Sequence, residues 1–332
     1  MEKLLIIGGA GFIGTNASYF FSKKKYKIMV IDKLTYAADI DNLKPLIRNK
    51  KILFKKIDIC NFNSLKLLLN SFKPNIIINF AAESHVDNSI NNPNNFYKSN
   101  VLGVYNILYA IKILQENKHR CYFFQVSTDE VYGSLKKGYA KESSNINPSS
   151  PYSASKAAGD ALVLGMCKTF NIKFNISRCT NNFGPFQYPE KLIPLSLKKT
   201  LKQNKIQIYG NGKNKRDWIY VDDHINAIYQ IIKKGKKNNI YNIGANNIYT
   251  NNNLIKILFK ILNNLKSKSV IKNFQSKIDY IKDRPAHDLR YAVNVNKIFK
   301  DTKWKVKTNF EKSLEQTVLW YLNKFDWHKN DK

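Results

Sequence analysis

Short apolar runs alternate with longer amphipathic stretches over the first half of the chain. The apolar runs have the length and residue types of buried strands and cover residues 3–8, 26–31, 52–57, 76–80, 121–126 and 174–178. Helical patterns lie between them over residues 12–25, 64–72, 95–117 and 151–170. Because strands that alternate with helices form parallel sheets, this order predicts an α/β fold with a doubly wound parallel sheet.

The character of the sequence changes after Cys179. Residues 181–192 are rich in turn formers, amides and aromatic side chains, so we interpret them as a shaped loop rather than a regular element. We therefore expect a sheet domain over residues 1–180. Residues 181–330 would form mainly a smaller α/β lobe that binds substrate, with segments that return to the sheet.

A glycine-rich turn joins the first strand to the first helix. Gly8 would permit a tight turn, Gly11 would let the backbone approach a pyrophosphate, and Gly14 would let the helix pack closely against the sheet. The second strand ends in Asp32, whose carboxylate could bind an adenosine ribose and would repel a 2′-phosphate. The pattern favours NAD over NADP, and the alternative is a glycine-rich turn in an unrelated α/β protein.

Polar or small residues also follow the third and fourth strands. Asp58 could meet an adenine amino group. Ala81 and Ala82 would leave room for a flat cofactor ring, although small residues at a strand end often only pack. Ser84 and His85 are candidates for contact with a phosphate or sugar of the substrate. Ligands of open α/β sheets bind at the carboxyl ends of the strands, so these residues share one expected site.

The strand over residues 121–126 runs into the polar stretch 127–133, which contains two adjacent acids, Asp129 and Glu130. When both are ionised they repel, so one is expected to keep its proton to higher pH. Downstream, Tyr152 and Lys156 are four residues apart and would share one helix face. Since a free tyrosine titrates near pH ~10, the neighbouring ammonium would stabilise the phenolate and make Tyr152 a usable base.

Composition limits the protein class. At 332 residues and 43% hydrophobic, the chain is long enough to bury a sizeable core. No basic leader or apolar run of membrane-spanning length is seen, which favours a soluble cytoplasmic protein. The four cysteines and five histidines are scattered, so we expect neither disulfides nor a metal site.

The formal net charge of +31, from 55 basic and 24 acidic residues, is unusual. Taken alone, it would suggest nucleic-acid binding. The lysines are spread along the whole chain, however, which is typical of a solvated surface rather than a focused polyanion site. We therefore expect no nucleic-acid partner, and a protein that binds RNA on a dinucleotide-binding fold is the alternative.

The glycine pattern, Asp32 and the Tyr152/Lys156 pair resemble the extended short-chain dehydrogenase/reductase family, whose members have an extended Rossmann fold. Within it, the chain resembles the dTDP-glucose 4,6-dehydratases over nearly its full length. The segments that carry this resemblance are 32–37, 81–87, 127–133, 181–185, 189–194, 216–218 and 283–288. The acid pair is the most specific signal, because 4-epimerases of this fold generally lack it and dehydratases of GDP-mannose carry serine before the glutamate.

The resemblance implies a reaction in which the sugar is oxidised, dehydrated and reduced again. Tyr152, aided by Lys156 and bridged through Thr128, would take the C4 hydroxyl proton while hydride passes from C4 to NAD⁺. Glu130 would then remove the C5 proton, and Asp129 would protonate the departing C6 oxygen. Return of the hydride to C6 with reprotonation of C5 would give dTDP-4-keto-6-deoxyglucose without net redox change, for deoxysugar synthesis of the dTDP-rhamnose type.

The resemblance also implies two sets of binding residues. NAD would be lined by Gly8, Gly11, Phe12, Ile13, Gly14, Asp32, Lys33, Leu34, Thr35, Asp58, Ile59, Ala81, Ala82, Asn100, Tyr152, Lys156 and Asn182. The dTDP-sugar would contact Ser84, Thr128, Asn181, Lys191, Leu192, Arg216, Asn251, Arg284 and His287. The chain departs from the family at Ala286, where glycine is usual, at Asn100, where threonine is common, and in the short segment after Gly133.

A homodimer is expected, formed by the outer sides of the helices predicted over residues 95–117 and 151–170. An ordinary core helix would show much the same pattern. The enzymatic alternatives are a nucleotide-sugar 4-epimerase and a dehydratase that uses a different nucleotide.

Overall fold

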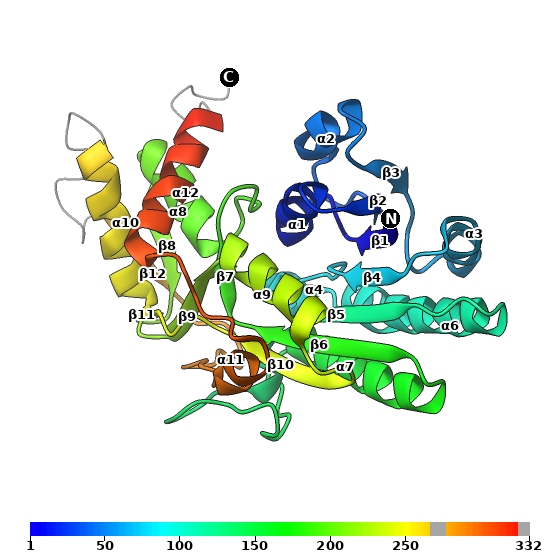
Figure 1. Cartoon of the computed structure of the whole chain (residues 1–332). Coiled ribbons are helices and arrows are strands. Elements are labelled where there is room, and N and C mark those ends of the chain that lie inside the picture. The colour runs from blue at the N-terminus through cyan, green and yellow to red at the C-terminus, as the bar shows by residue number, and fades with distance from the viewer. Residues whose placement is uncertain (266–276, 325–332) are drawn as a thin grey trace.

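The computed structural model describes residues 1–265 and 277–324. A seven-stranded parallel sheet lies at its centre, in the order β10-β6-β5-β4-β1-β2-β3 (Figure 1). Its strands are β1 (Glu2–Ile7), β2 (Tyr26–Asp32), β3 (Leu53–Lys56), β4 (Ile76–Asn79), β5 (Tyr122–Thr128), β6 (Lys173–Cys179) and β10 (Asn239–Ile243). Every strand predicted over residues 1–180 is present, and the predicted fold class is confirmed.

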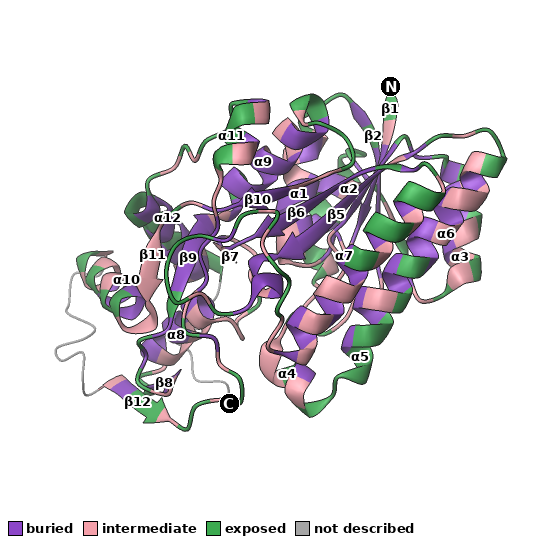
Figure 2. Ribbon diagram, turned by 90° about the horizontal axis from the view of Figure 1, so that it is seen from below, coloured by how far each residue is buried: buried purple, intermediate pink, exposed green. Residues whose placement is uncertain are grey.

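Alternating side chains of the strands build a core on each face of the sheet. Leu4 and Ile6 of β1 pack on the face covered by α1 (Phe12–Ser22), α2 (Lys44–Arg48), α9 (Val221–Lys234) and α11 (Asn296–Thr302). Leu5 and Ile7 pack on the face covered by α3 (Phe62–Phe72), α6 (Gly103–Glu116) and α7 (Pro151–Thr169). Figure 2 shows the buried sheet between helices whose outer turns are exposed, as expected for a sheet buried on both faces.

A smaller lobe is built from the C-terminal half of the chain and lies to one side of the large sheet (Figure 1). Its strands are β7 (Asn181–Phe183), β9 (Lys215–Tyr220) and β11 (Ile248–Thr250) in one sheet, and β8 (Ile206–Tyr209) and β12 (Ile278–Ile281) in another. Its helices are α8 (Leu192–Leu201), α10 (Asn251–Leu265) and α12 (Phe310–Lys324). Because β7 starts just after β6 ends, the lobe is attached at the carboxyl edge of the large sheet.

Two local predictions need correction. Residues 181–183 are strand β7 rather than loop, because they pair with β9, a partner that turn-forming composition does not reveal. The helix predicted over residues 95–117 is continuous only through a π-helical turn, η2 (Lys98–Leu102), between α5 (Asn94–Tyr97) and α6. This turn brings the Asn100 amide inward, where it bonds to the Glu83 backbone and to the Ser155 hydroxyl.

None of the helices in the described ranges combines the length and the apolar character that crossing a membrane requires.

Replacing Gly14 by Ala is expected to destabilise the glycine turn. A Cβ at Gly14 would lie 2.1 Å from the Gly8 carbonyl oxygen, and Gly8 itself needs its φ of +74°. Since neither backbone segment can move easily, the free energy of unfolding should fall by about 1–3 kcal/mol, measured by urea unfolding. Lys23→Ala, at the exposed C-terminal end of the same helix, should change stability by less than about 0.5 kcal/mol. Equal stability of Gly14→Ala and wild type would contradict the close approach.

Candidate active site

The carboxyl end of β5 positions the acid pair. Thr128 closes the strand and caps the short 3₁₀-helix η3 (Asp129–Tyr132), with its Oγ1 accepting a hydrogen bond from the Glu130 backbone N–H at 3.3 Å. The pair therefore begins a turn at the edge of the sheet where ligands of this fold bind. Asp129 is 3% exposed, and Glu130 is partly buried.

Helix α7 positions Tyr152 and Lys156. Its start is defined by a capping box between Ser150 and Ser153 and by Pro151 in the first turn, so Tyr152 lies near the N-terminus of the helix. One turn further along, the Lys156 ammonium donates to the Val126 carbonyl oxygen on β5 at 2.8 Å. The tyrosine–lysine pair and the acid pair thus meet at the end of the same strand.

Burial sets the titration of Tyr152 and Lys156. The pKa of Tyr152 is raised by burial and by the Glu130 and Asp129 charges, and it is lowered by the Thr128 side chain. This direction is opposite to the one expected from the sequence, because burial outweighs the interactions that lower the pKa. Burial also lowers the pKa of Lys156 to about 8, against the opposing charge of Asp160.

The two adjacent acids differ in their surroundings. Burial raises the pKa of Asp129 well above its usual range, and the charges of Glu130 and Asp217 add to this. Burial also raises the pKa of Glu130, but three cations, Arg216, Lys191 and Arg284, favour its ionised form. Asp129 is therefore the group suited to carry a proton, and Glu130 is the group suited to accept one.

Tyr291 was missed by the sequence reasoning. Its hydroxyl donates to Glu130 Oε2 at 3.4 Å and to Asp288 Oδ2 at 2.5 Å, and the Arg216 guanidinium lies 4.3 Å from its ring centre. Asp288 ends one of the segments that carry the family resemblance, but nothing in the local pattern around Tyr291 indicates a contact with the acid pair.

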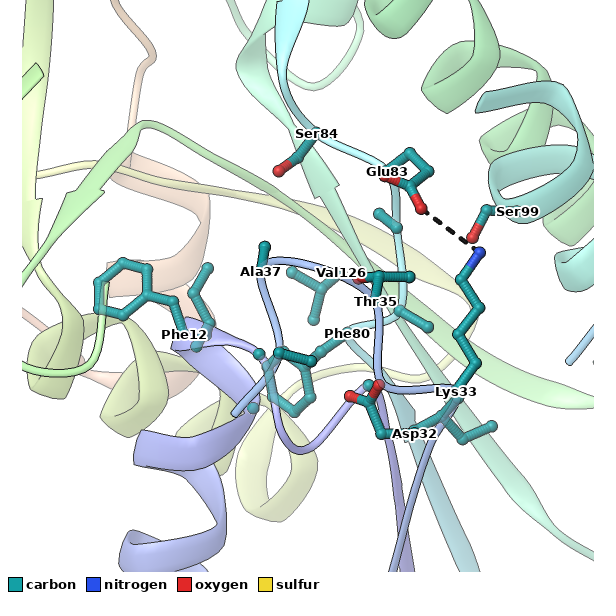
Figure 3. Close-up of a pocket in the computed structure, with 18 of the residues that line it drawn as sticks. Phe12, Asp32, Lys33, Thr35, Ala37, Phe80, Glu83, Ser84, Ser99 and Val126 are labelled. Carbon is teal, nitrogen blue, oxygen red and sulfur yellow. Dashed lines mark ion pairs between the residues drawn. The ribbon is translucent and has the colours of Figure 1, made fainter. Parts of the chain in front are cut away.

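A cleft extends from Ser127, at the end of β5, and Tyr152 across the glycine turn (Figure 3). It is lined by most of the residues predicted to bind NAD, namely Gly8, Gly11, Phe12, Ile13, Gly14, Asp32, Lys33, Thr35, Ile59, Ala81, Ala82, Tyr152 and Lys156. Ser84 and Lys191, predicted to bind the sugar nucleotide, line it as well. Lining residues that the sequence did not single out include Glu83, Ser99, Gln187, Tyr188 and Glu190.

The cleft has the features that a dinucleotide needs. Helix α1 starts at Gly11 without a side-chain cap and has no acidic residue in its first turn, so its N-terminal amides can bind a pyrophosphate. The Asp32 carboxylate accepts from the backbone N–H groups of Ala10 and Leu34, at 3.0 and 2.8 Å, which holds it at the end of β2. Lys33 reaches Glu83 at 3.3 Å, as Figure 3 shows.

Leu34, Asp58, Asn100 and Asn182, also predicted to bind NAD, do not line this cleft. The Leu34 backbone N–H donates a hydrogen bond to the Asp32 carboxylate, and the Cys60 backbone N–H donates one to the Asp58 carboxylate. The Asn182 amide donates to Thr180 O and Cys179 Sγ, and its Oδ1 lies 2.9 Å from His224 Nδ1. The Asn100 and Asn182 side chains thus serve to connect loops around the site.

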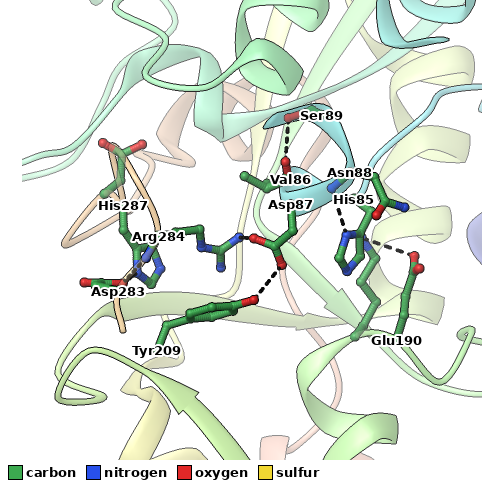
Figure 4. Close-up of polar contacts among 12 residues, drawn as sticks. His85, Val86, Asp87, Asn88, Ser89, Glu190, Tyr209, Asp283, Arg284 and His287 are labelled. Carbon is green, nitrogen blue, oxygen red and sulfur yellow. Dashed lines mark hydrogen bonds and ion pairs between the residues drawn. The ribbon is translucent and has the colours of Figure 1, made fainter. Parts of the chain in front are cut away.

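The residues predicted to bind the sugar nucleotide surround the other end of the site. Figure 4 shows Arg284 paired with Asp87 at 3.3 Å, with Tyr209 donating to the same carboxylate. His287 contacts Asp283 at 2.6 Å. The contacts of Arg284 and Tyr209 with Asp87 join α4 (Val86–Asn91) of the large domain to the smaller lobe.

The remaining predicted binding residues lie on several different elements. Arg216 donates to the Asp288 carbonyl oxygen and, with Lys191 and Arg284, brings positive charge to Glu130. Lys191 donates to the Ser84 carbonyl oxygen at 2.9 Å. Asn181 starts β7, Leu192 packs against the core of the smaller lobe, and Asn251 starts α10. His85 caps α4.

Comparison with known proteins decides the family. The family model described as GDP-mannose 4,6 dehydratase matches residues 5–317. The dTDP-glucose 4,6-dehydratase of Escherichia coli is 37% identical, over 98% of this chain and 95% of its own. A probable dTDP-glucose 4,6-dehydratase of Sinorhizobium fredii is 38% identical over 98% of this chain and 94% of its own.

The chain belongs to the dTDP-glucose 4,6-dehydratase family. Solved members of this family have the same fold. The enzyme from Streptomyces venezuelae, determined with NAD and TYD bound, superposes with a TM-score of 0.90 at 35% identity, and 98% of each chain is covered. The enzyme from Bacillus anthracis, in complex with NAD, superposes with a TM-score of 0.86 at 38% identity and the same coverage.

The fold is shared beyond this family. The UDP-glucose 4-epimerase of Thermotoga maritima superposes with a TM-score of 0.85 at 24% identity, a likeness that concerns the fold alone. Within the described residues, no group of three or more histidine, cysteine, aspartate or glutamate side chains could hold a metal ion.

Proposed function

We propose that this protein converts dTDP-glucose to dTDP-4-keto-6-deoxyglucose and water, with NAD as cofactor. The observation that carries the proposal is the buried Asp129–Glu130 pair next to Tyr152 and Lys156, in a chain that belongs to the dTDP-glucose 4,6-dehydratase family. Oxidation alone would need only the tyrosine and the lysine. Elimination of water needs, in addition, one carboxylate that accepts a proton and one carboxylic acid that donates a proton.

Tyr152 and Thr128 begin the reaction. In its phenolate form, which burial and the neighbouring acids oppose, Tyr152 would accept the proton of the C4 hydroxyl. Thr128, whose side chain lowers the pKa of Tyr152, would bridge the tyrosine and the sugar. Lys156 supplies a positive charge on the same helix face. When bound, NAD would supply the hydride acceptor for C4 and the hydride donor for C6, where hydride return is accompanied by reprotonation of C5, so the cofactor should stay bound through turnover.

Glu130 and Asp129 carry out the elimination. Once C4 is a ketone, the C5 proton becomes acidic and Glu130 removes it. Asp129, which burial keeps protonated, hands its proton to the C6 oxygen, and water leaves. Tyr291 and Arg216 border Glu130 and favour its carboxylate form by a hydrogen bond and a positive charge.

The binding residues divide between the two parts of the chain. We infer that residues 1–180 hold NAD, mainly through the glycine turn, Asp32, and the small residues Ala81 and Ala82. Most of the residues that would hold the dTDP-sugar come from residues 181–330, and Ser84 and Thr128 reach it from the sheet domain. The departure from the family pattern at Asn100 is accommodated within the sheet domain, where its amide bonds to the Glu83 backbone and to the Ser155 hydroxyl.

The test is to incubate the purified protein, without added cofactor, with dTDP-glucose and with UDP-glucose, and to follow the sugar nucleotides by mass. Loss of one water from the dTDP sugar alone would support the reaction, the nucleotide and retained NAD together. If neither mass changes, also after NAD⁺ is added, the proposal fails. An isomer of unchanged mass would point to a 4-epimerase, and loss of water from the UDP sugar to another nucleotide preference.

Replacing Arg284 by Ala is expected to raise KM for dTDP-glucose about 10- to 100-fold, with a smaller change in kcat. We infer that its guanidinium, oriented by Asp87 and by the Tyr209 ring, binds the diphosphate equally in the ground and transition states. Steady-state kinetics measure this change. Arg120→Ala, an exposed arginine of the sheet domain, serves as the control and should leave KM unchanged. A kcat loss at constant KM would contradict a pure binding role.

We further infer a homodimer that forms through α6 and α7. Leu102, Tyr105 and Leu164 are 44, 40 and 40% exposed, and Ala158, Leu162 and other apolar residues line a groove on α7. Such a surface favours a partner helix pair. A cytoplasmic location, deoxysugar synthesis of the dTDP-rhamnose type and the absence of a nucleic-acid partner complete the proposal. Salt-dependent retention of RNA without sugar turnover would contradict it.

A further inference from the structure

The face of α7 that carries Tyr152 and Lys156 carries a third buried residue, Asp160, one turn beyond the lysine. The three side chains are 8, 4 and 2% exposed. Residues four apart on a helix are neighbours on one face, so Asp160 follows Lys156 along the face of α7 that carries the tyrosine. A buried carboxylate is costly unless it is paired and hydrogen-bonded, so its presence directly behind the Tyr152/Lys156 pair calls for a reason.

Arg178 on β6 is the partner of Asp160. Its Nε donates to Asp160 Oδ2 at 3.0 Å, with both side chains almost fully buried. Its Nη1 donates to the Tyr132 hydroxyl at 3.1 Å, and the guanidinium lies 4.9 Å from the centre of that ring. The Tyr132 hydroxyl in turn donates to Asn242 on β10 at 2.8 Å.

This network joins two parts of the active site. Tyr132 is the last residue of η3, the turn that begins with the acid pair, while Asp160 lies on the helix of Tyr152 and Lys156. Because Arg178 binds both, it sets the position of that turn relative to α7. Its planar fork suits this task, since each nitrogen donates in a defined direction.

The network also supplies negative charge to Lys156. Burial lowers the lysine pKa to about 8, and Asp160 is the charged group that opposes this effect. Burial raises the pKa of Asp160, and the Arg178 guanidinium on β6, which bonds to Asp160 Oδ2, opposes this and favours the ionised carboxylate. From η3, Asp129 and Glu130 act on Tyr152. Without the Asp160 carboxylate, Lys156 and Arg178 would be two buried cations lacking their counter-charge.

We propose that Asp160 and Arg178 are positioning residues that hold Lys156 as a cation and hold the Asp129–Tyr132 turn against α7. The catalytic consequence rests on the proposed function, whereas the coupling between Asp160 and Lys156 does not. The experiments below separate the two.

The first experiment measures kcat against pH for Asp160→Asn. Without the carboxylate, Lys156 should lose its proton at lower pH. The alkaline limb of the kcat–pH profile should therefore shift to lower pH by about one unit, which is a tenfold change in the protonation equilibrium of Lys156. At pH values below this limb, kcat should approach that of wild type. Asp160→Glu should restore the limb.

The matched control is Asp223→Asn. Asp223 is a buried carboxylate of α9 that accepts from Lys307 N and Thr308 N, so its loss should lower stability without moving the limb. A limb that stays in place in Asp160→Asn, or that moves as much in Asp223→Asn, would overturn the proposal.

The second experiment needs no substrate. A double-mutant cycle of Lys156→Met and Asp160→Asn in the full chain gives their coupling from urea unfolding at about pH 6 and about pH 10. The folded pKa of Lys156, about 8, lies below the unfolded value, so the ammonium is present in the fold at the lower pH and absent at the higher. At the lower pH, the unfolding constant of the double variant should differ at least about threefold from the value expected if the two substitutions acted independently. At the higher pH it should equal that value.

Coupling that is absent, or equal at both pH values, would refute the link between Asp160 and Lys156 even in an active enzyme. A chain that shows the coupling but leaves dTDP-glucose unchanged would instead refute the proposed function alone.

Tyr132→Phe tests the other half of the proposal and keeps it testable if Asp160→Asn does not fold. The ring remains over Arg178, but the hydroxyl that joins Arg178 to Asn242 is lost. We expect kcat to fall about threefold or more at unchanged KM, with the alkaline limb in place. Unchanged kcat would refute the role of Arg178 in holding the turn.

Discussion

Replacing Glu130 by Gln should lower turnover of dTDP-glucose by about 10²- to 10⁴-fold, the range in which positioned acid–base groups contribute. Glutamine has nearly the same shape and can still accept a hydrogen bond from Tyr291, but it cannot take the C5 proton. The first step does not use Glu130. The variant should therefore still oxidise C4 and stop before the elimination.

Two measurements test this expectation. Rapid mixing of the variant with substrate should show the absorbance of reduced nicotinamide rising and persisting, while mass analysis finds no loss of water. Glu315→Gln, an exposed glutamate of α12, is the matched control and should turn over like wild type. Full turnover by Glu130→Gln would remove the assignment of the base.

Replacing Tyr152 by Phe should lower turnover by a similar factor, about 10²- to 10⁴-fold, but at the earlier step. The phenyl ring keeps its edge-to-face contact with Phe96, at 6.3 Å between ring centres, so the helix should remain in place. Without the hydroxyl there is no base for the C4 hydroxyl proton. In contrast to Glu130→Gln, no reduced nicotinamide should build up.

The same rapid-mixing experiment separates the two variants. Tyr26→Phe is the control, because this buried tyrosine starts β2, at the edge of the sheet opposite the active site, and should have wild-type kinetics. Reduced nicotinamide that accumulates in Tyr152→Phe at the wild-type rate would mean that another group takes the proton. Lys156, whose pKa of about 8 permits it to act as a base, would then be the first candidate.

The two variants also distinguish this chain from an epimerase of the same fold. Both chemistries begin with oxidation at C4, so both need the tyrosine. Only the elimination needs a base at C5, and so a defect at Glu130 that leaves oxidation intact is a signature of dehydration. The likeness of this fold to a UDP-glucose 4-epimerase shows why fold alone does not decide between them.

Local patterns predicted much of the site. The glycine turn and the residues at the ends of β2, β4 and β5 were found from sequence because each follows directly from a strand pattern and its neighbouring turn. The pairing of Tyr152 with Lys156 on one face required only helical spacing. The two local predictions that needed correction depended on contacts between distant parts of the chain. Strand β7 exists because it pairs with β9, and the π-helical turn forms around contacts of Asn100 with residues far along the chain.

From the sequence alone we could predict the order of strands and helices, the glycine turn and the two pairs proposed to act in catalysis. These features depend on residues within a few positions of each other. Only the tertiary structure decided what surrounds them: Tyr291, 161 residues from Glu130, bonds to that glutamate, and Arg178 joins Asp160 to Tyr132. It also reversed the expected direction of the Tyr152 pKa. The physical reason is burial, since desolvation and long-range charge depend on which chain segments pack together.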